Sequence, residues 1–314
     1  MRKFLIDTDA GIDDSVAVMM AFAQPDIEIV AVTSVFGTST LEHTTRNVRD
    51  VCGLIGLNTR IGVGAEKAII KPKREAQPGG FHGMNGVGDV VLPSSGLVPD
   101  GRKAWDVMCE EAYRQGGNLE IVTLGPLTNL AIALLKYPVL ASLVKRLVIM
   151  GGSAKTGNVS AHAEANLFGD PLAGEIVFRS GIKEIILVGL NATEQCRLTT
   201  AETNHLFSKK TVVHPYIDKM LETYKNSQNK NGEAGMLIND GVAMAVAIDP
   251  SIAEILPCHV TCEMMPTHNE GRTVADFRPF SEHKKNVGVT MAISRKQYVE
   301  ILSGTIDFLA EKAH

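Results

Sequence analysis

The strongest chemical signal in this 314-residue chain is a group of aspartates near its start. Asp7, Asp9, Asp13 and Asp14 lie close together in the segment IDTDAGIDDSVAV. Like charges on one turn repel one another unless a cation lies between them, and a hard divalent cation prefers oxygen ligands. The same acids could instead cap a following helix, but one N-terminus needs one such residue rather than four. The segment therefore favours a site for a hard divalent cation.

Two familiar acidic motifs do not fit this spacing. An EF-hand loop beginning at Asp7 would need glycine at its sixth position and glutamate at its twelfth, where the chain has Ile12 and Val18. A phosphotransfer motif of the D-x-D-x-T type would need threonine or valine where Gly11 stands. Neither an EF-hand nor a haloacid-type phosphatase is therefore expected.

The elements around the aspartates predict where they lie in the fold. Residues 4–6 form a short aliphatic segment typical of a buried strand, and residues 15–24 fit a helix that follows it. Aliphatic runs then alternate with amphipathic stretches, which is typical of βαβ units. We expect an α/β, Rossmann-like fold with a mostly parallel central sheet and flanking helices. Ligands of such sheets bind at the carboxyl ends of the strands, where the aspartates stand.

The remaining elements follow the same pattern. Further strands are predicted at residues 28–35, 59–63, 119–124, 144–150 and 184–188, with helices at 41–56, 105–114, 127–136 and 170–180. Helical patterns at 202–225 and 242–248 precede two strand-like segments, HVTCEMM and VGVTMAI, and an amphipathic terminal helix. Residues 71–101 are rich in glycine and proline and predict a long irregular loop, which inside a compact domain is usually functional or disordered.

Composition excludes several classes of function. Lysine and arginine number 31 against 35 acids, a net charge of −4, which gives no sign of the basic face that nucleic-acid polymers require. No run approaches the roughly 18 apolar residues of a membrane span, and the first residues do not form a secretory signal. Five scattered cysteines without a C-x-x-C pair indicate neither a disulfide framework nor a zinc ribbon. We expect a cytoplasmic protein without a membrane or nucleic-acid partner.

The aspartate segment also fits a family pattern. The motif D-T-D-x-G-x-D-D at residues 7–14 resembles the N-terminal signature of the inosine-uridine preferring nucleoside hydrolases. Further segments follow in that family's order: AVTSVFG with TRN after it, FHGMNGVG, TLGPLTNLA, LVIMGG, GNVSAHAEANLFGDP, ND at 239–240, and GRTVAD. The resemblance implies one nucleoside hydrolase domain over residues 1–314 and a homodimer or homotetramer. It also implies hydrolysis of ribonucleosides, with purine, pyrimidine or modified bases, to ribose and free base.

The resemblance assigns a calcium site to the acids. Asp9, Asp14 and Asp240 match the family's Ca²⁺ ligands, together with the backbone carbonyl of Leu124, for which the side chain is irrelevant. Asp9 also matches the residue proposed to take a proton from the metal-bound water. The chemistry supports these roles, because a metal lowers the pKa of a bound water enough for a neighbouring carboxylate to deprotonate it.

A cradle for the ribose is implied in the same way. Asp13 matches a residue that binds the ribose hydroxyls. The other matching residues are Asn158, Glu164, Asn166 and Met150. Cleavage of an N-glycosidic bond develops positive charge on the sugar ring, which carboxylates and amides around it stabilise.

Two positions depart from the family pattern. Asn239 precedes Asp240 where many members carry a histidine that protonates the leaving base, and asparagine has no titrating proton. Thr38 follows Gly37 where the family usually has asparagine near the ribose. We expect Thr38, Asn239 and Asp240 to contact substrate. His82, in the glycine-rich loop, is the candidate acid, with a loop-packing histidine as the alternative. The two departures leave a second function open, a nucleoside- or ribose-binding module with weakened or lost catalysis.

Four other residues draw attention by type or position. Tyr224 precedes the polar stretch NSQNKNGEAG and resembles the family's mobile segment that closes over the base, with a solvated linker as the alternative. Cys258 and Cys262 are four apart in a predicted strand, so both should face one side as small core residues. Trp105 is expected in the core as well.

Overall fold

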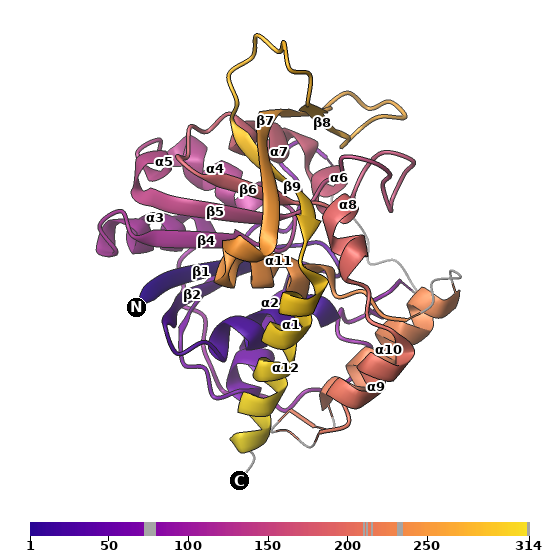
Figure 1. Cartoon of the computed structure of the whole chain (residues 1–314). Coiled ribbons are helices and arrows are strands. Elements are labelled where there is room, and N and C mark those ends of the chain that lie inside the picture. Colours follow the sequence, from indigo (N-terminus) through magenta and orange to yellow (C-terminus); the bar gives the residue numbers. More distant parts are fainter. Residues whose placement is uncertain (72–79, 210, 212, 215, 231–234, 313–314) are drawn as a thin grey trace.

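The structure is a computed structural model that describes residues 1–71, 80–209, 211, 213–214, 216–230 and 235–312. Its described strands form one sheet in the order β3-β2-β1-β4-β5-β6-β9-β7-β8 (Figure 1). The strands are β1 (Arg2–Thr8), β2 (Ile27–Ser34), β3 (Arg60–Val63), β4 (Leu119–Thr123), β5 (Val144–Met150), β6 (Ile185–Val188), β7 (Ala253–Cys262), β8 (Thr273–Asp276) and β9 (Val287–Ile293). Only β7 runs antiparallel to its neighbours β9 and β8. The expected α/β fold with a mostly parallel sheet is confirmed.

Helices cover both faces of this sheet, which explains why its strands are continuous aliphatic runs. In β1, Phe4 and Ile6 pack on one face and Leu5 on the other. The first face is covered by α1 (Ile12–Phe22), α2 (Leu41–Leu54), α10 (Tyr216–Lys230), α11 (Asn239–Ile248) and α12 (Arg295–Glu311). The second is covered by α3 (Ala104–Arg114), α4 (Thr128–Lys136), α5 (Leu140–Leu143) and α7 (Pro171–Phe178).

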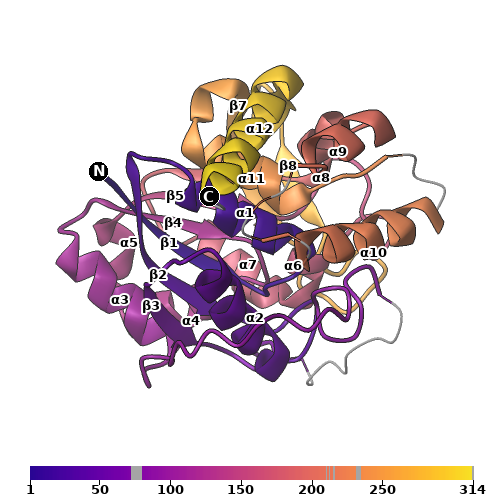
Figure 2. The ribbon, with the colours of Figure 1, turned by 90° about the horizontal axis from the view of Figure 1, so that it is seen from below.

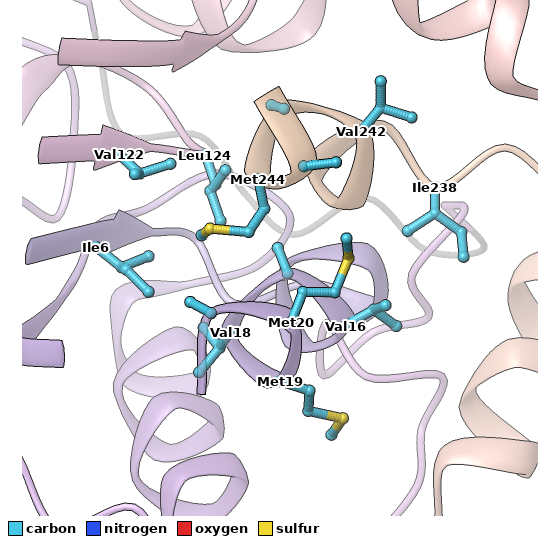
Figure 3. Packing of buried hydrophobic residues seen from close by; sticks show 14 of the residues in the cluster. Ile6, Val16, Val18, Met19, Met20, Val122, Leu124, Ile238, Val242 and Met244 are labelled. Atoms are coloured by element: carbon cyan, nitrogen blue, oxygen red, sulfur yellow. The ribbon is translucent and has the colours of Figure 1, made fainter. Parts of the chain in front are cut away.

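The closest helix pair on the first face is α1 and α11, and α12 packs against both, as Figures 1 and 2 show. Val18 of α1 and Met244 of α11 lie in the same buried cluster as Ile6 of β1 and Val122 of β4 (Figure 3). This apolar layer holds the N-terminal ends of α1 and α11 at the carboxyl edge of the sheet. Both helices carry aspartates in their first turn.

The order of the strands defines where a ligand site should form. From β1 the chain moves outward to β2 and β3, and then returns to β4 on the other side of β1. Such a reversal leaves a crevice beyond the carboxyl ends of the two central strands. Asp7 pairs with Thr123 across that junction, and the N–H of Leu124 donates to the carbonyl of Asp7 over 2.8 Å. The segments that begin at Asp9 and Leu124 therefore leave the sheet side by side.

Some element boundaries differ from the sequence-based expectation. Helix α1 begins at Ile12 rather than at residue 15, and Asp13 and Asp14 lie in its first turn. The helical pattern at 202–225 is two helices, α9 (Thr200–Leu206) and α10, and Thr199 and Glu202 form a capping box at the start of α9. Helix α10 continues through residues 226–230, so the first five residues of the polar stretch are helical, while residues 231–234 lie outside the described part of the chain. Strand β8 and the short α6 (Ala165–Gly169) and α8 (Leu190–Thr193) were not predicted.

Other expectations hold in the described residues. Residues 80–101 contain no helix or strand, as the glycine-rich composition indicates, whereas 72–79 lie outside the description. Cys258 and Cys262 are both buried in the core against the second face, as expected. Trp105 was expected in the core as well, but it is only half-buried at the margin of that cluster. Within the described part of the chain, no helix is long and apolar enough to cross a membrane.

Candidate active site

The turn after β1 is fixed by hydrogen bonds among its own residues. The hydroxyl of Thr8 donates to Asp14 Oδ1, and the N–H of Gly11 donates to Asp14 Oδ2 over 2.9 Å. The N–H of Ala10 donates to Thr8 Oγ1, also over 2.9 Å, and Ala10 adopts a φ of +48° in the left-handed region that non-glycine residues rarely enter. Both carboxylate oxygens of Asp14 are thereby held at the N-terminus of α1.

Buried carboxylates converge at this turn. Oxygens of Asp13, Asp14 and Asp240 lie within 4.8 Å of one another, and all three side chains are buried. Asp9 is buried beside them, so α1, α11 and the β1 turn contribute to one acidic cluster. Burial, followed by the negative charges of its neighbours, raises the pKa of Asp240 well above the usual range. Burial and the charge of Asp14 do the same to the pKa of Asp9.

The cluster has the properties of a cation site. Asp240 Oδ1 is buried and has no hydrogen-bond partner among the described residues. None of the four carboxylates pairs with a lysine or arginine in the described part of the chain. An acidic group of this kind is stable only if its members bind protons or a cation. All its donor atoms are oxygens, the ligand type of hard divalent cations.

Asp9 is anchored from the β2 side of the site. The backbone N–H of Thr38 donates to Asp9 Oδ2 over 2.6 Å, and the Thr38 hydroxyl donates to the Asp9 carbonyl over 2.8 Å. Gly37 makes this approach possible, because a β-carbon there would lie 1.9 Å from Asp9 Oδ2. Position 37 therefore requires glycine for space rather than for backbone conformation.

We expect Gly37→Ala to lower kcat by about a hundredfold, because the methyl group must displace the Asp9 carboxylate by an ångström or more. Steady-state rates would measure the loss. Gly304→Ala is the matched control, since a β-carbon at that exposed position of α12 meets nothing within 4 Å. That variant should keep full activity and gain roughly 0.5–1 kcal/mol in unfolding free energy. If Gly37→Ala and Gly304→Ala were equally active, the precise position of the Asp9 carboxylate would not matter for catalysis.

A second set of polar groups lies beyond β4 and β5. Glu164 caps α6 and accepts the N–H groups of Gly152 at 2.9 Å, Asn166 at 2.8 Å and Leu167 at 3.2 Å. The side-chain amide of Asn166 donates to the carbonyl of Leu124 over 2.9 Å and to that of Met150 over 3.2 Å. These contacts bring together Glu164, Asn166 and Met150, which the resemblance assigns to the ribose, and Leu124, which it assigns to the metal.

Asn158 stands apart from that group. Its side chain is exposed, and its Oδ1 accepts the N–H of Ala165 over 3.0 Å at the start of α6. The contact ties the loop that carries Asn158 to the segment that carries Glu164, but it places no Asn158 atom in the acidic cluster. A sugar contact from Asn158 stays a prediction.

Glu164 should make the stability of the fold depend on pH. Burial outweighs its backbone donors and raises the pKa of Glu164 from 4.5 to about 7. The folded state therefore keeps this proton when the unfolded chain has lost it, so stability falls as pH rises from about 4.5 to about 7. We expect Glu164→Gln to remove about 3 kcal/mol of that fall in unfolding free energy. Urea titrations across this pH range would measure it, with the exposed Glu300→Gln as control. Parallel pH curves for wild type and Glu164→Gln would contradict this assignment.

Two aromatic side chains adjoin Asp13. Tyr224 donates its hydroxyl to Asp13 Oδ2 over 3.0 Å, and the His82 ring lies 5.1 Å from the Tyr224 ring. The solvated-linker alternative for Tyr224 is wrong: the side chain is buried and lies within α10, so the helix itself brings it to the site. His82 Nδ1 lies 3.8 Å from Asp13 Oδ1 and accepts the N–H of Ile12 over 3.1 Å. That bond assigns the proton of a neutral ring to Nε2.

Asn239 occupies the first position of α11, directly before Asp240. Its Oδ1 accepts the hydroxyl of Thr193 over 2.8 Å. Thr193, Thr8 and Gly37 support site residues but were not identified from the sequence. Thr8 could have been noted between two of the aspartates, and Gly37 next to Thr38. Thr193 carried no signal, since it lies 46 residues from its partner.

The fold and the site together define a class. This is a Rossmann-like α/β enzyme with an all-oxygen acidic site at the reversal of strand order. The chain matches the model of the inosine-uridine preferring nucleoside hydrolases over residues 4–300, and it belongs to that family. It is accordingly an N-glycosyl hydrolase.

Individual relatives agree with this assignment. The chain is 36% identical to uridine nucleosidase 1 of Arabidopsis thaliana over 260 residues, 80% of this chain and 75% of the relative. It is 30% identical to the pyrimidine-specific ribonucleoside hydrolase RihA of Escherichia coli O9:H4, over 98% of both chains. Among solved structures, the purine-preferring ribonucleoside hydrolase of Gardnerella vaginalis matches with a TM-score of 0.93 and 30% identity, over 99% of this chain and 100% of that one. These relatives differ in the base that their names specify.

Proposed function

We propose that the protein hydrolyses the N-glycosidic bond of ribonucleosides to ribose and free base, and that it does so with Ca²⁺. The observation that carries this proposal is the convergence of buried carboxylates beside the Glu164–Asn166 group at one edge of the sheet. The first set suits a cation, and the second offers acceptors and donors for a polyhydroxylated sugar.

The proposed calcium ligands are Asp9, Asp14, Asp240 and the carbonyl oxygen of Leu124. Carboxylates and a backbone carbonyl are the usual ligands of Ca²⁺. Asp240 Oδ1, buried and without a partner in the described residues, is the atom that most needs such a ligand. A divalent cation held there supplies positive charge that lowers the pKa of a water molecule.

Asp9 is the proposed general base. Thr38 fixes one carboxylate oxygen, which limits the directions in which the group can accept a proton. Burial and the charge of Asp14 raise its pKa, and a higher pKa makes the ionised carboxylate a stronger base. As the bond between C1′ and the base nitrogen breaks, its electron pair goes to the base. The water oxygen then bonds to C1′ and its proton goes to Asp9.

The sugar would be held from two sides. Asp13, whose Oδ2 now accepts the Tyr224 hydroxyl, would accept ribose hydroxyls instead or in addition. Glu164, Asn166, Asn158 and Met150 would complete the cradle. Negative charge and amide dipoles near the ring stabilise the oxocarbenium-like transition state more than the neutral substrate.

His82 is the proposed donor to the departing base. Its Nδ1 accepts a backbone N–H, so the opposite nitrogen of the neutral ring, Nε2, carries the hydrogen. The ring also contacts Tyr224, which restricts its rotation. An oriented Nε2–H of the neutral ring can donate a hydrogen bond to the base as it leaves.

A panel of uridine, cytidine, inosine, adenosine and guanosine tests the proposal. Purified protein with calcium should release reducing sugar from at least one of them. The relatives' names cover both purine and pyrimidine preferences, so the panel also decides the base preference. Binding by calorimetry without turnover over hours would instead favour the nucleoside-binding module.

A further inference from the structure

The hydrogen bond between Thr193 and Asn239 fixes the side chain that stands where many family members have a histidine. Thr193 is the last residue of α8, which follows β6, and its side chain is fully buried. Asn239 is the first residue of α11 and is half-buried. Helix α8 packs against α11, so the pair is held by the main chain on both sides.

The hydroxyl of Thr193 has two acceptors within reach. Asn239 Oδ1 lies at 2.8 Å, whereas the carbonyl of Leu190 in the preceding turn lies at 3.5 Å. A hydroxyl has one proton to donate, and the shorter contact has the usual length of an O–H···O bond. The proton therefore goes to Asn239.

This bond selects one orientation of the Asn239 amide. Because Oδ1 faces Thr193, the amide nitrogen Nδ2 faces away from Thr193. Nδ2 forms no hydrogen bond with any described residue, and Asn239 keeps some exposure beside Asp240. The side chain can thus offer two N–H donors to a ligand, while its carbonyl oxygen faces Thr193.

We propose that Thr193 is a positioning residue for departure of the base, which it assists by presenting the Asn239 amide as a hydrogen-bond donor. The inference rests on the proposed nucleoside hydrolysis and names a feature of its substrate. The base must offer an acceptor, a carbonyl oxygen or an unprotonated ring nitrogen, next to the nitrogen that is released. When the glycosidic electron pair moves onto the base, a donated hydrogen bond stabilises the charge that develops there. Asn239 transfers no proton.

Two substrates separate this role from a structural one. The base of a nucleoside is a poor leaving group whose developing negative charge must be stabilised. 4-Nitrophenyl β-D-ribofuranoside instead releases 4-nitrophenolate, an anion that is stable without a hydrogen bond from the protein. We expect Thr193→Val to lower kcat/KM for the nucleoside about five- to tenfold and to leave the rate with the nitrophenyl riboside within twofold. Thr193→Ser should restore the nucleoside rate, because it returns the hydroxyl without the methyl group.

Thr305→Val is the matched control. Thr305 is also a buried threonine, but its hydroxyl donates to the carbonyl of Ile301 within α12. Its replacement should leave the ratio of the two rates unchanged. Asn239→Leu should lower the nucleoside rate at least as much as Thr193→Val, and the double variant should be no slower than Asn239→Leu alone, since both changes remove one interaction.

Three outcomes would overturn the inference. They are an equal loss on both substrates in Thr193→Val, no loss on either, or full additivity in the double variant. A wild-type protein that hydrolyses neither substrate would instead refute the proposed function. The failure of one proposal is therefore distinguishable from the failure of the other.

Discussion

Asp9→Asn is expected to lower kcat for nucleoside hydrolysis by about 10³- to 10⁴-fold. Asparagine is nearly isosteric and keeps an oxygen that can accept the Thr38 N–H, so the local geometry should persist. It cannot take up a proton, so the proposed general base is lost. Ribose release at saturating substrate would measure the effect, with Asp9→Ala as a second variant expected to be at least as slow.

The exposed Asp307→Asn on α12 is the control and should have wild-type rates. Calcium-free Asp9→Asn should also unfold at a higher temperature than calcium-free wild type. Burial and the charge of Asp14 raise the pKa of the Asp9 carboxyl. An ionised carboxylate in such surroundings destabilises the folded state, and the substitution removes it. A variant that retained a tenth or more of the wild-type kcat would exclude Asp9 as the base.

Removal of calcium is expected to abolish activity and to destabilise the fold. At a calcium concentration a hundred times Kd, binding contributes about 3 kcal/mol of stability, which chelation would remove. Without the cation, stability should fall as pH rises from about 4, because Asp9, Asp14 and Asp240 have raised pKa values and the folded state holds protons that the unfolded chain releases. Melting temperatures between pH 5 and pH 8, in EGTA and in calcium chloride, would measure both effects.

Added calcium should flatten this pH dependence, since the cation replaces the protons. Asp14→Asn provides the comparison, because it removes one proposed ligand and should weaken the response to calcium. Full activity in EGTA, or equal melting curves with and without calcium, would contradict the calcium proposal. Recovery by magnesium alone would keep the cation site but change its identity.

The regular part of the fold was predictable because both sheet faces are covered. A strand buried on two sides must be aliphatic throughout, and that signal is local in sequence. The division between α9 and α10 was not predicted, because amphipathic periodicity continues across residues 202–225, although α9 ends at Leu206 and α10 begins at Tyr216. Strand β8 is only four residues long and pairs only with β7 among the described strands, so its sequence pattern is too short to detect.

The aspartates of the site were predictable for a similar reason. Asp9, Asp13 and Asp14 are neighbours in sequence, and the strand before them indicates which edge of the sheet they occupy. Contacts across the chain are different. Tyr224 and Asp13 are 211 residues apart, and their bond depends on where α10 packs. A local sequence pattern cannot predict a contact between residues so far apart in the chain, so the hydrogen bonds that hold the site side chains in place were seen only in the structure.

The carbonyl oxygen of Leu124 has a further consequence. It is a proposed calcium ligand, and it also accepts the amide of Asn166, a proposed ribose ligand. The proposed calcium ligand would therefore be in direct contact with the proposed ribose ligand, and a shift of Asn166 toward a sugar would change the electron density that the carbonyl offers to a cation. Binding free energies that are coupled in this way are coupled equally in both directions. The nucleoside should then tighten calcium binding by the same factor by which calcium tightens nucleoside binding, so the proposed cation and substrate would bind as one coupled unit.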